Sequence, residues 1–108
     1  MRAIIAKLAI LALLLPILSN AGEPMIIDVR TASEYQTQNV EGAINIEFQS
    51  IVDGLQQRDI GTDTEIFVYC GSGKRAGMAK DSLNAAGYND VTNLGGLEQA
   101  LVFSARHD

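Results

Sequence analysis

The chain has little of several residue types: no tryptophan, one cysteine, one histidine and two prolines in 108 residues. A single cysteine excludes an internal disulfide. One cysteine with one histidine also falls short of the usual four-ligand zinc site, so we expect neither a metal centre nor a cofactor. The histidine is His107, next to the chain end, where residues usually fray. A paired Cys–His catalytic centre is therefore not expected.

Basic residues are also few, with 8 lysines and arginines against 13 aspartates and glutamates and a net charge of −5. An acidic surface does not favour binding to nucleic acid or to an anionic membrane. Against this background the adjacent Lys74 and Arg75 stand out as a local positive site.

Residues 1–21 have the layout of a secretory signal peptide. Arg2 contributes positive charge near the start, residues 8–18 form an apolar run, and small residues precede a cleavage point after Ala21. The run is shorter than the roughly 20 apolar residues that a membrane-spanning helix needs. We therefore expect cleavage and export to the periplasm, with no lasting membrane anchor, and a single monomeric domain at residues 22–108.

Short apolar segments alternate with helical patterns along the rest of the chain, which indicates an α/β fold. We expect a parallel sheet of four to five short strands with helices on both faces. Strands are predicted at residues 25–29, 43–46, 66–69 and 91–94, and helices at 31–38, 48–58, 74–86 and 97–104. In the third helix, the inward positions are expected to be Met78, Leu83 and Ala86.

Local signals refine these boundaries. Thr31 and Glu34 have capping-box spacing at a helix start. Gly87 is placed to cap the third helix at its C-terminus. Gly95 and Gly96 are expected to form a tight turn before the last helix.

The most informative segment is Cys70 with the loop after it. The loop residues are Gly71, Ser72, Gly73, Lys74 and Arg75. Ligands in open α/β sheets bind beyond the carboxyl ends of the strands, where Cys70 is expected to fall. Backbone amides of the loop, the start of the following helix and the two basic side chains would all stabilise a thiolate. The loop therefore predicts an ionised, nucleophilic cysteine in an anion-binding cradle.

No general base accompanies the cysteine, so a reaction without proton abstraction from the substrate fits best. Attack on a sulfane sulfur is such a reaction. The alternative interpretation is that Cys70 is a buried structural residue without a chemical role. Asp28 and Arg30 are expected to form a structural ion pair or a turn contact, and Glu34 is explained by the helix cap alone.

The sequence resembles a single-domain rhodanese, a thiosulfate sulfurtransferase. The resemblance rests on segments that occur in the family's order across residues 22–108: Ile27-Asp28-Val29-Arg30, Glu41-Gly42-Ala43-Ile44-Asn45-Ile46, Val68-Tyr69-Cys70 with its loop, Gly87-Tyr88 and Asn93-Leu94-Gly95-Gly96-Leu97. It implies that Cys70 takes sulfur from thiosulfate as a persulfide and passes it to cyanide, to a thiol or to an acceptor protein. The loop residues from Gly71 to Arg75 would bind the donor.

Two alternatives remain open. The chain would otherwise be a sulfur-carrier or redox-partner module that accepts persulfide from another protein. An arsenate reductase or phosphatase is the third reading, and loop length disfavours it. The active-site loop of rhodaneses has the pattern Cys-x4-Arg, which is also the spacing from Cys70 to Arg75 here. The loop of the related phosphatases is one residue longer, Cys-x5-Arg.

Overall fold

The computed structural model describes residues 23–107, so the predicted signal peptide at 1–21 lies outside the described residues. Its elements are β1 (Met25–Asp28), α2 (Ala32–Thr37), β2 (Ile44–Asn45), the 3-10 helix η1 (Phe48–Ser50), α3 (Ile51–Gln57), β3 (Ile66–Cys70), α4 (Lys74–Ala85), β4 (Val91–Gly96) and α5 (Leu97–Arg106). Within 23–107 no helix has both the length and the apolar character needed to cross a membrane.

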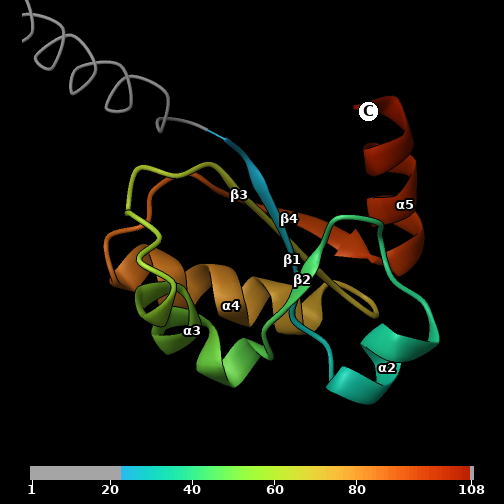
Figure 1. The fold of residues 1–108 in the computed structure, drawn as a ribbon, viewed down its shortest axis with the longest axis horizontal. Helices are drawn as coiled ribbons and strands as arrows, with labels where there is room; N and C mark the ends of the chain where they lie inside the picture. Colours follow the sequence, from blue (N-terminus) through green and yellow to red (C-terminus); the bar gives the residue numbers. More distant parts are fainter. Residues whose placement is uncertain (1–22, 108) are drawn as a thin grey trace, which may run out of the picture.

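The four strands form one parallel sheet in the order β2-β1-β3-β4 (Figure 1). The chain passes from β1 to β2 in one direction, and from β3 to β4 in the other. The connections therefore diverge between β1 and β3, the kind of position where open α/β sheets bind ligands. Cys70 is the last residue of β3 and lies at the carboxyl edge beside this divergence.

Helices cover both faces of the sheet, which confirms the predicted α/β class. On one face, α3 and α4 contribute Leu55 and Leu83 to a buried cluster that includes Val68 of β3. On the other face, Ala100 of α5 packs in a smaller cluster with Tyr69. Figure 1 shows α3 and α4 together on one side and α5 on the other.

The inward face of α4 differs from the prediction at one position. Ala76, Ala79 and Leu83 are fully buried, whereas Met78 is 48% exposed. Residues three or four apart share a helix face, and Met78 is two positions from Ala76, which places it on nearly the opposite side. The expectation that Met78 points inward was wrong, and small alanines fill the contact instead.

The predicted Gly95-Gly96 turn was also wrong, because both glycines belong to β4. Tyr69 pairs with Gly95 and Cys70 with Gly96, after a register shift between Val68 and Tyr69. Gly95 has a φ of +96°, a conformation that a glycine adopts without strain. Leu94 is left without a partner between Asn93 and Gly95, so β4 bulges at Leu94 and the two glycines continue the strand alongside the cysteine.

Other local signals are confirmed. Thr31 and Glu34 form the capping box at the start of α2. Gly87 follows α4 with a φ of +99° and ends the helix as expected. The helix predicted over 48–58 is divided into η1 and α3, because Ser50 leaves helical geometry with a φ of −111° and a ψ of 15°.

Candidate active site at the Cys70 loop

The Cys70 side chain is fully buried at the end of β3, beneath the loop that follows it. Its Sγ accepts a hydrogen bond from the backbone N–H of Gly73 at 3.0 Å and another from Ala76 at 3.3 Å. The loop folds back on the sulfur because Gly73 has a φ of +101°, which residues with a β-carbon rarely adopt. The amide of Gly73 belongs to the loop that the sequence singled out, whereas the amide of Ala76 lies one residue beyond it and was not predicted.

The cradle favours the thiolate over the thiol. Burial raises the pKa of Cys70, but hydrogen bonds from the backbone amides of Ala76, Ser72, Gly73 and Arg75 outweigh burial and lower the pKa below its ordinary value. A lowered pKa increases the fraction of nucleophilic thiolate near neutral pH. The groups that lower this pKa belong to the backbone, and no histidine is among them.

Strand β4 supports the loop from the side. Asn93 donates from Nδ2 to the carbonyl oxygen of Gly73 at 3.0 Å, and its Oδ1 accepts from the N–H of Gly95 at 2.8 Å. The Gly95 α-carbon lies near Gly73, 3.3 Å from the point where a β-carbon on that residue would be. Asn93 and Gly95 of β4 therefore position the loop. This role of Asn93 was not predicted from the sequence.

Arg75 makes a contact that was not foreseen either. Its Nη1 and Nη2 donate to Glu34 Oε1 and Oε2 at 2.8 and 3.2 Å. Glu34 belongs to α2, so this ion pair joins the cysteine loop to the helix that follows β1. No local signal could predict a pair between residues so distant in the sequence.

Lys74 is exposed at the start of α4. Only two ion pairs lie within 4.0 Å among residues 23–107, Arg30–Asp28 and Arg75–Glu34. In this part of the chain, Lys74 therefore has no carboxylate partner. The positive charge of Arg75 is thus paired with a carboxylate, and that of Lys74 is not.

Asp28 and Arg30 form the structural ion pair that the sequence predicted. Arg30 Nη2 lies 2.7 Å from Asp28 Oδ2, and both side chains are almost completely buried. The N–H of Arg30 also donates to Asp28 Oδ1 at 2.9 Å. The guanidinium lies 5.7 Å from the ring centroid of Tyr69. The pair fixes the end of β1 next to the strand that carries Cys70.

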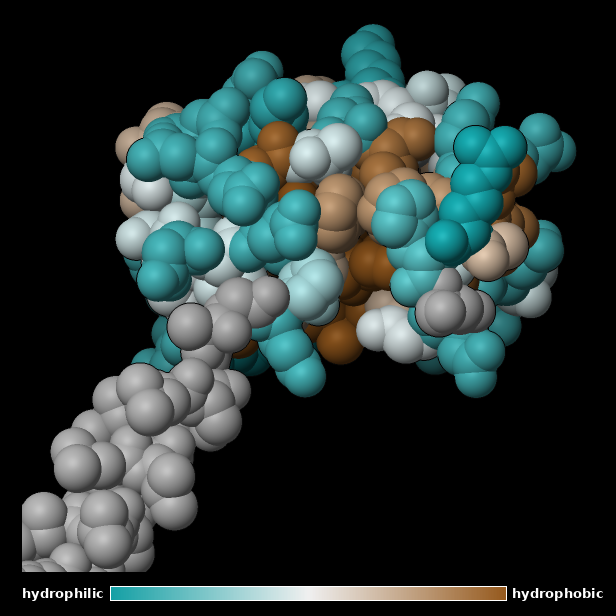
Figure 2. Space-filling model, turned by 90° about the horizontal axis from the view of Figure 1, so that it is seen from above, coloured by the Kyte–Doolittle hydropathy of each residue, from teal (hydrophilic) through white to brown (hydrophobic). Residues whose placement is uncertain are grey.

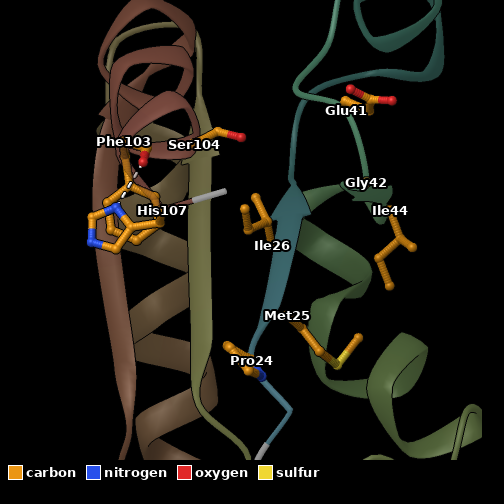
Figure 3. Close-up of a pocket in the computed structure, with 9 residues that line it drawn as sticks. All are labelled: Pro24, Met25, Ile26, Glu41, Gly42, Ile44, Phe103, Ser104 and His107. Carbon is orange, nitrogen blue, oxygen red and sulfur yellow. Dashed lines mark hydrogen bonds between the residues drawn. The ribbon is translucent and has the colours of Figure 1, made fainter.

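His107 lies far along α5 from the strand ends that form the site. Its Nδ1 is 2.7 Å from the carbonyl oxygen of Phe103, and the two rings stack with centroids 4.0 Å apart. Both residues line a pocket of about 240 Å³ that includes Met25 at the amino end of β1 (Figure 3). The space-filling view shows hydrophobic surface gathered in a hollow between hydrophilic side chains (Figure 2). No residue of the Cys70 loop lines this pocket.

Metal chemistry has no candidate centre in the described part of the chain. Within residues 23–107, no group of three or more histidine, cysteine, aspartate or glutamate side chains is arranged to hold an ion.

A parallel sheet with a cysteine cradled by amides at its carboxyl edge defines a class of small α/β domains, and the comparisons identify it. Residues 14–100 match the family model of the rhodanese-like domain, so the chain belongs to the rhodanese-like family. This confirms the resemblance drawn from the motifs.

Its relatives include enzymes that transfer sulfur. The chain is 38% identical over 72 residues to the thiosulfate sulfurtransferase PspE of Escherichia coli K12, over 67% of this chain and 69% of PspE. It is 29% identical over 79 residues to the thiosulfate:glutathione sulfurtransferase of Saccharomyces cerevisiae, over 63% of this chain and 57% of that enzyme. The structure of an E. coli rhodanese with anions matches with a TM-score of 0.68 and 35% identity, over 71% and 91% of the two chains.

Proposed function

We propose that this protein is a thiosulfate sulfurtransferase that works through a persulfide on Cys70. The Cys70 thiolate attacks the outer sulfur of thiosulfate and forms a new sulfur–sulfur bond. The bond between the two thiosulfate sulfurs breaks, and its electron pair leaves with sulfite. Cyanide or a thiolate then attacks the terminal sulfur of the persulfide and releases the Cys70 thiolate. Two successive half-reactions of this kind give ping-pong kinetics.

The observation that carries the proposal is the pair of hydrogen bonds from Gly73 and Ala76 to the Cys70 sulfur. Donors that converge on one point stabilise an anion there without reorganisation. In the persulfide the negative charge moves to the terminal sulfur. We expect the amides of the loop to hold this sulfur as they hold the thiolate.

The remaining loop residues have supporting roles in this proposal. Gly71 and Ser72 contribute backbone amides and little bulk near the sulfur. Lys74 contributes positive charge at the start of α4, where a divalent anion such as thiosulfate would approach, and the charge of the neighbouring Arg75 is paired with Glu34. Sequence similarity to PspE, whose name specifies thiosulfate, supports this choice of donor.

We further propose that the enzyme acts in the periplasm as a monomer comprising residues 22–108. The support is the signal-peptide pattern of residues 1–21. The acceptor in that compartment is proposed to be a small thiol or a cysteine of another protein.

The test is thiocyanate formation from thiosulfate and cyanide by the purified protein, with the Cys70→Ser variant alongside. Intact-mass measurement after thiosulfate alone detects a sulfur adduct. We expect turnover and an adduct of one sulfur atom, both absent in Cys70→Ser. An adduct without turnover would favour the sulfur-carrier reading. Absence of both would exclude sulfur transfer, and turnover by Cys70→Ser would exclude the persulfide mechanism.

A further inference from the structure

The side chains of Arg75 and Glu34 are 30% and 40% exposed, and their ion pair is bidentate. Both nitrogens at the tip of the arginine contact the two carboxylate oxygens of Glu34, at 2.8 and 3.2 Å. Glu34 Oε1 also accepts hydrogen bonds from the backbone N–H and the Oγ1 of Thr31, each at 3.0 Å. The carboxylate is thus fixed by its own helix cap while it holds the arginine. Arg75 is not free to turn toward a donor without leaving these contacts.

The pair also has a defined place relative to the cysteine loop. Helix α2 follows β1 and the loop follows β3, and these are the neighbouring strands at which the chain connections diverge. A β-carbon on Gly71 would lie 3.2 Å from Arg75 Nη2, so the guanidinium lies over the first residue of the loop. Glu34 therefore draws Arg75 across the outside of the loop.

The ion pair also determines the net charge beside the cysteine loop. The hydrogen bonds from Arg75 and from Thr31 lower the pKa of Glu34 to about 2, so its carboxylate is ionised at neutral pH. The opposite charges of the pair largely cancel for an anion that approaches from solvent. Lys74 has no carboxylate within 4.0 Å among residues 23–107, so its charge is not offset in this way.

We propose that Glu34 is a positioning residue that holds and neutralises Arg75, and that donor capture rests on the loop amides and Lys74. The division of roles rests on the proposed function for its substrate. In this division of roles, Arg75 acts mainly by cancelling the charge of Glu34 beside the loop. A direct anion-binding role for Arg75 is the competing explanation.

A double-mutant cycle on thiosulfate kinetics separates the two explanations. The four proteins are the wild type, Arg75→Ala, Glu34→Gln and the double variant, and KM and kcat are measured for each. Arg75→Ala leaves an unpaired carboxylate near a dianion, so we expect KM to rise about tenfold. Adding Glu34→Gln should restore most of this loss. A double variant as impaired as Arg75→Ala would overturn the proposal.

The single Glu34→Gln variant gives a result that damage to the structure would not produce. Its amide can keep a hydrogen bond to Arg75 but no longer offsets the arginine charge, so KM for thiosulfate should fall. A rise in KM would contradict the proposal. Lys74→Ala should raise KM with little change in kcat, and Lys80→Ala, on the same helix, is the matched control with unchanged KM.

A second measurement needs no sulfur transfer. Cys70 is the only thiol, so its alkylation by anionic iodoacetate and neutral iodoacetamide reports the potential at the sulfur directly. The rate ratio of iodoacetate to iodoacetamide should rise in Glu34→Gln, fall in Arg75→Ala and in Lys74→Ala, and recover in the Arg75→Ala/Glu34→Gln variant. An unrecovered ratio would overturn the proposal even if thiosulfate is not the donor. Conversely, a recovered ratio without turnover would contradict only the proposed function.

Folding is checked by thermal unfolding of each variant. If Arg75→Ala does not fold, Arg75→Gln replaces it in the cycle, because glutamine removes the charge and keeps a polar side chain. Adding Glu34→Gln to Arg75→Gln should likewise restore KM and the alkylation ratio. If neither is restored, the proposal is overturned.

Discussion

The carbonyl oxygen of Gly71 lies directly against the α-carbon of Gly96, where a β-carbon would be only 2.4 Å from that oxygen. Gly71 is the first residue after the cysteine, and Gly96 is the last residue of β4. Side chains at this separation are essentially never tolerated against backbone, so the close approach requires glycine. The end of β4 therefore sets how tightly the loop closes over Cys70.

Gly96→Ala is expected to displace the loop, because its methyl group meets a backbone atom that cannot rotate away. Overpacking of this kind costs about 1–3 kcal/mol of unfolding free energy. We also expect a large loss of turnover, because the amides of Gly73 and Ala76 would no longer converge on the sulfur. Urea unfolding and thiocyanate formation are the measurements.

Gly77→Ala, on α4, is the matched control, since a β-carbon there would lie 3.6 Å from Nδ2 of Asn93 on β4, an ordinary van der Waals distance. Alanine in a helix interior should be neutral or stabilising by about 0.5–1 kcal/mol. Equal stability and equal activity of Gly96→Ala and Gly77→Ala would show that the loop tolerates the extra carbon.

The Cys70 thiol should ionise at a lower pH than a free cysteine, because the backbone amides of the loop stabilise its thiolate. The alkylation rate with iodoacetamide, followed from about pH 5 to 10, gives the pKa of this single thiol. We expect a midpoint below the roughly 8.5 of an unperturbed cysteine. A midpoint at or above that value would mean that burial outweighs the amides.

Asp28→Asn should be strongly destabilising, because it leaves the buried guanidinium of Arg30 without its counter-charge. Removing one partner of a buried ion pair typically costs about 3–5 kcal/mol. Urea unfolding measures the loss. Asp53→Asn, on an exposed position of α3, is the control and should change the stability by less than about 0.5 kcal/mol. A loss below about 1 kcal/mol in Asp28→Asn would argue that water or a neighbour replaces the carboxylate.

Glu34 should contribute to stability in a pH-dependent way. Its pKa is lowered from 4.5 in the unfolded reference to about 2 in the fold. A carboxyl group with a depressed folded pKa stabilises above its unfolded pKa, and this contribution is lost as the pH falls toward the folded value. The difference in melting temperature between the wild type and Glu34→Gln should therefore shrink from about pH 5 to pH 2.

Glu41→Gln, an exposed carboxylate before β2, is the control for this titration. Its difference from the wild type should vary less over the same pH range. A Glu34→Gln difference that is constant with pH would indicate that the carboxylate is not stabilised by Arg75 and Thr31 in solution.

Signals between neighbouring residues predicted much of the fold. The apolar runs of β1 and β3, the capping box at Thr31 and the glycine after α4 each depend on a few consecutive residues. The loop around Cys70 was predicted for the same reason, because its glycines, basic residues and helix start are adjacent in the sequence. The roles assigned to the individual loop residues stay predictions.

Features that depend on packing between elements were missed. Met78 has the hydrophobicity of a core residue, but the sheet accepts only the small side chains of Ala76 and Ala79 at that contact. Gly95 and Gly96 carry a turn signal, but pairing with Tyr69 and Cys70 of β3 keeps both glycines in the strand. The Glu34–Arg75 pair joins two crossover connections, and their approach follows from the strand order.

The burial of the Cys70 sulfur also bears on its resistance to oxidation in the periplasm, the location that we propose. Thiolates are oxidised in steps to sulfenic and then irreversible sulfinic and sulfonic acids, and access to the sulfur controls the rate. No second cysteine is present to rescue a sulfenic acid as an internal disulfide. We therefore expect the closed loop to slow the oxidation of Cys70, and Gly96→Ala, which displaces the loop, to increase the rate of oxidation by peroxide.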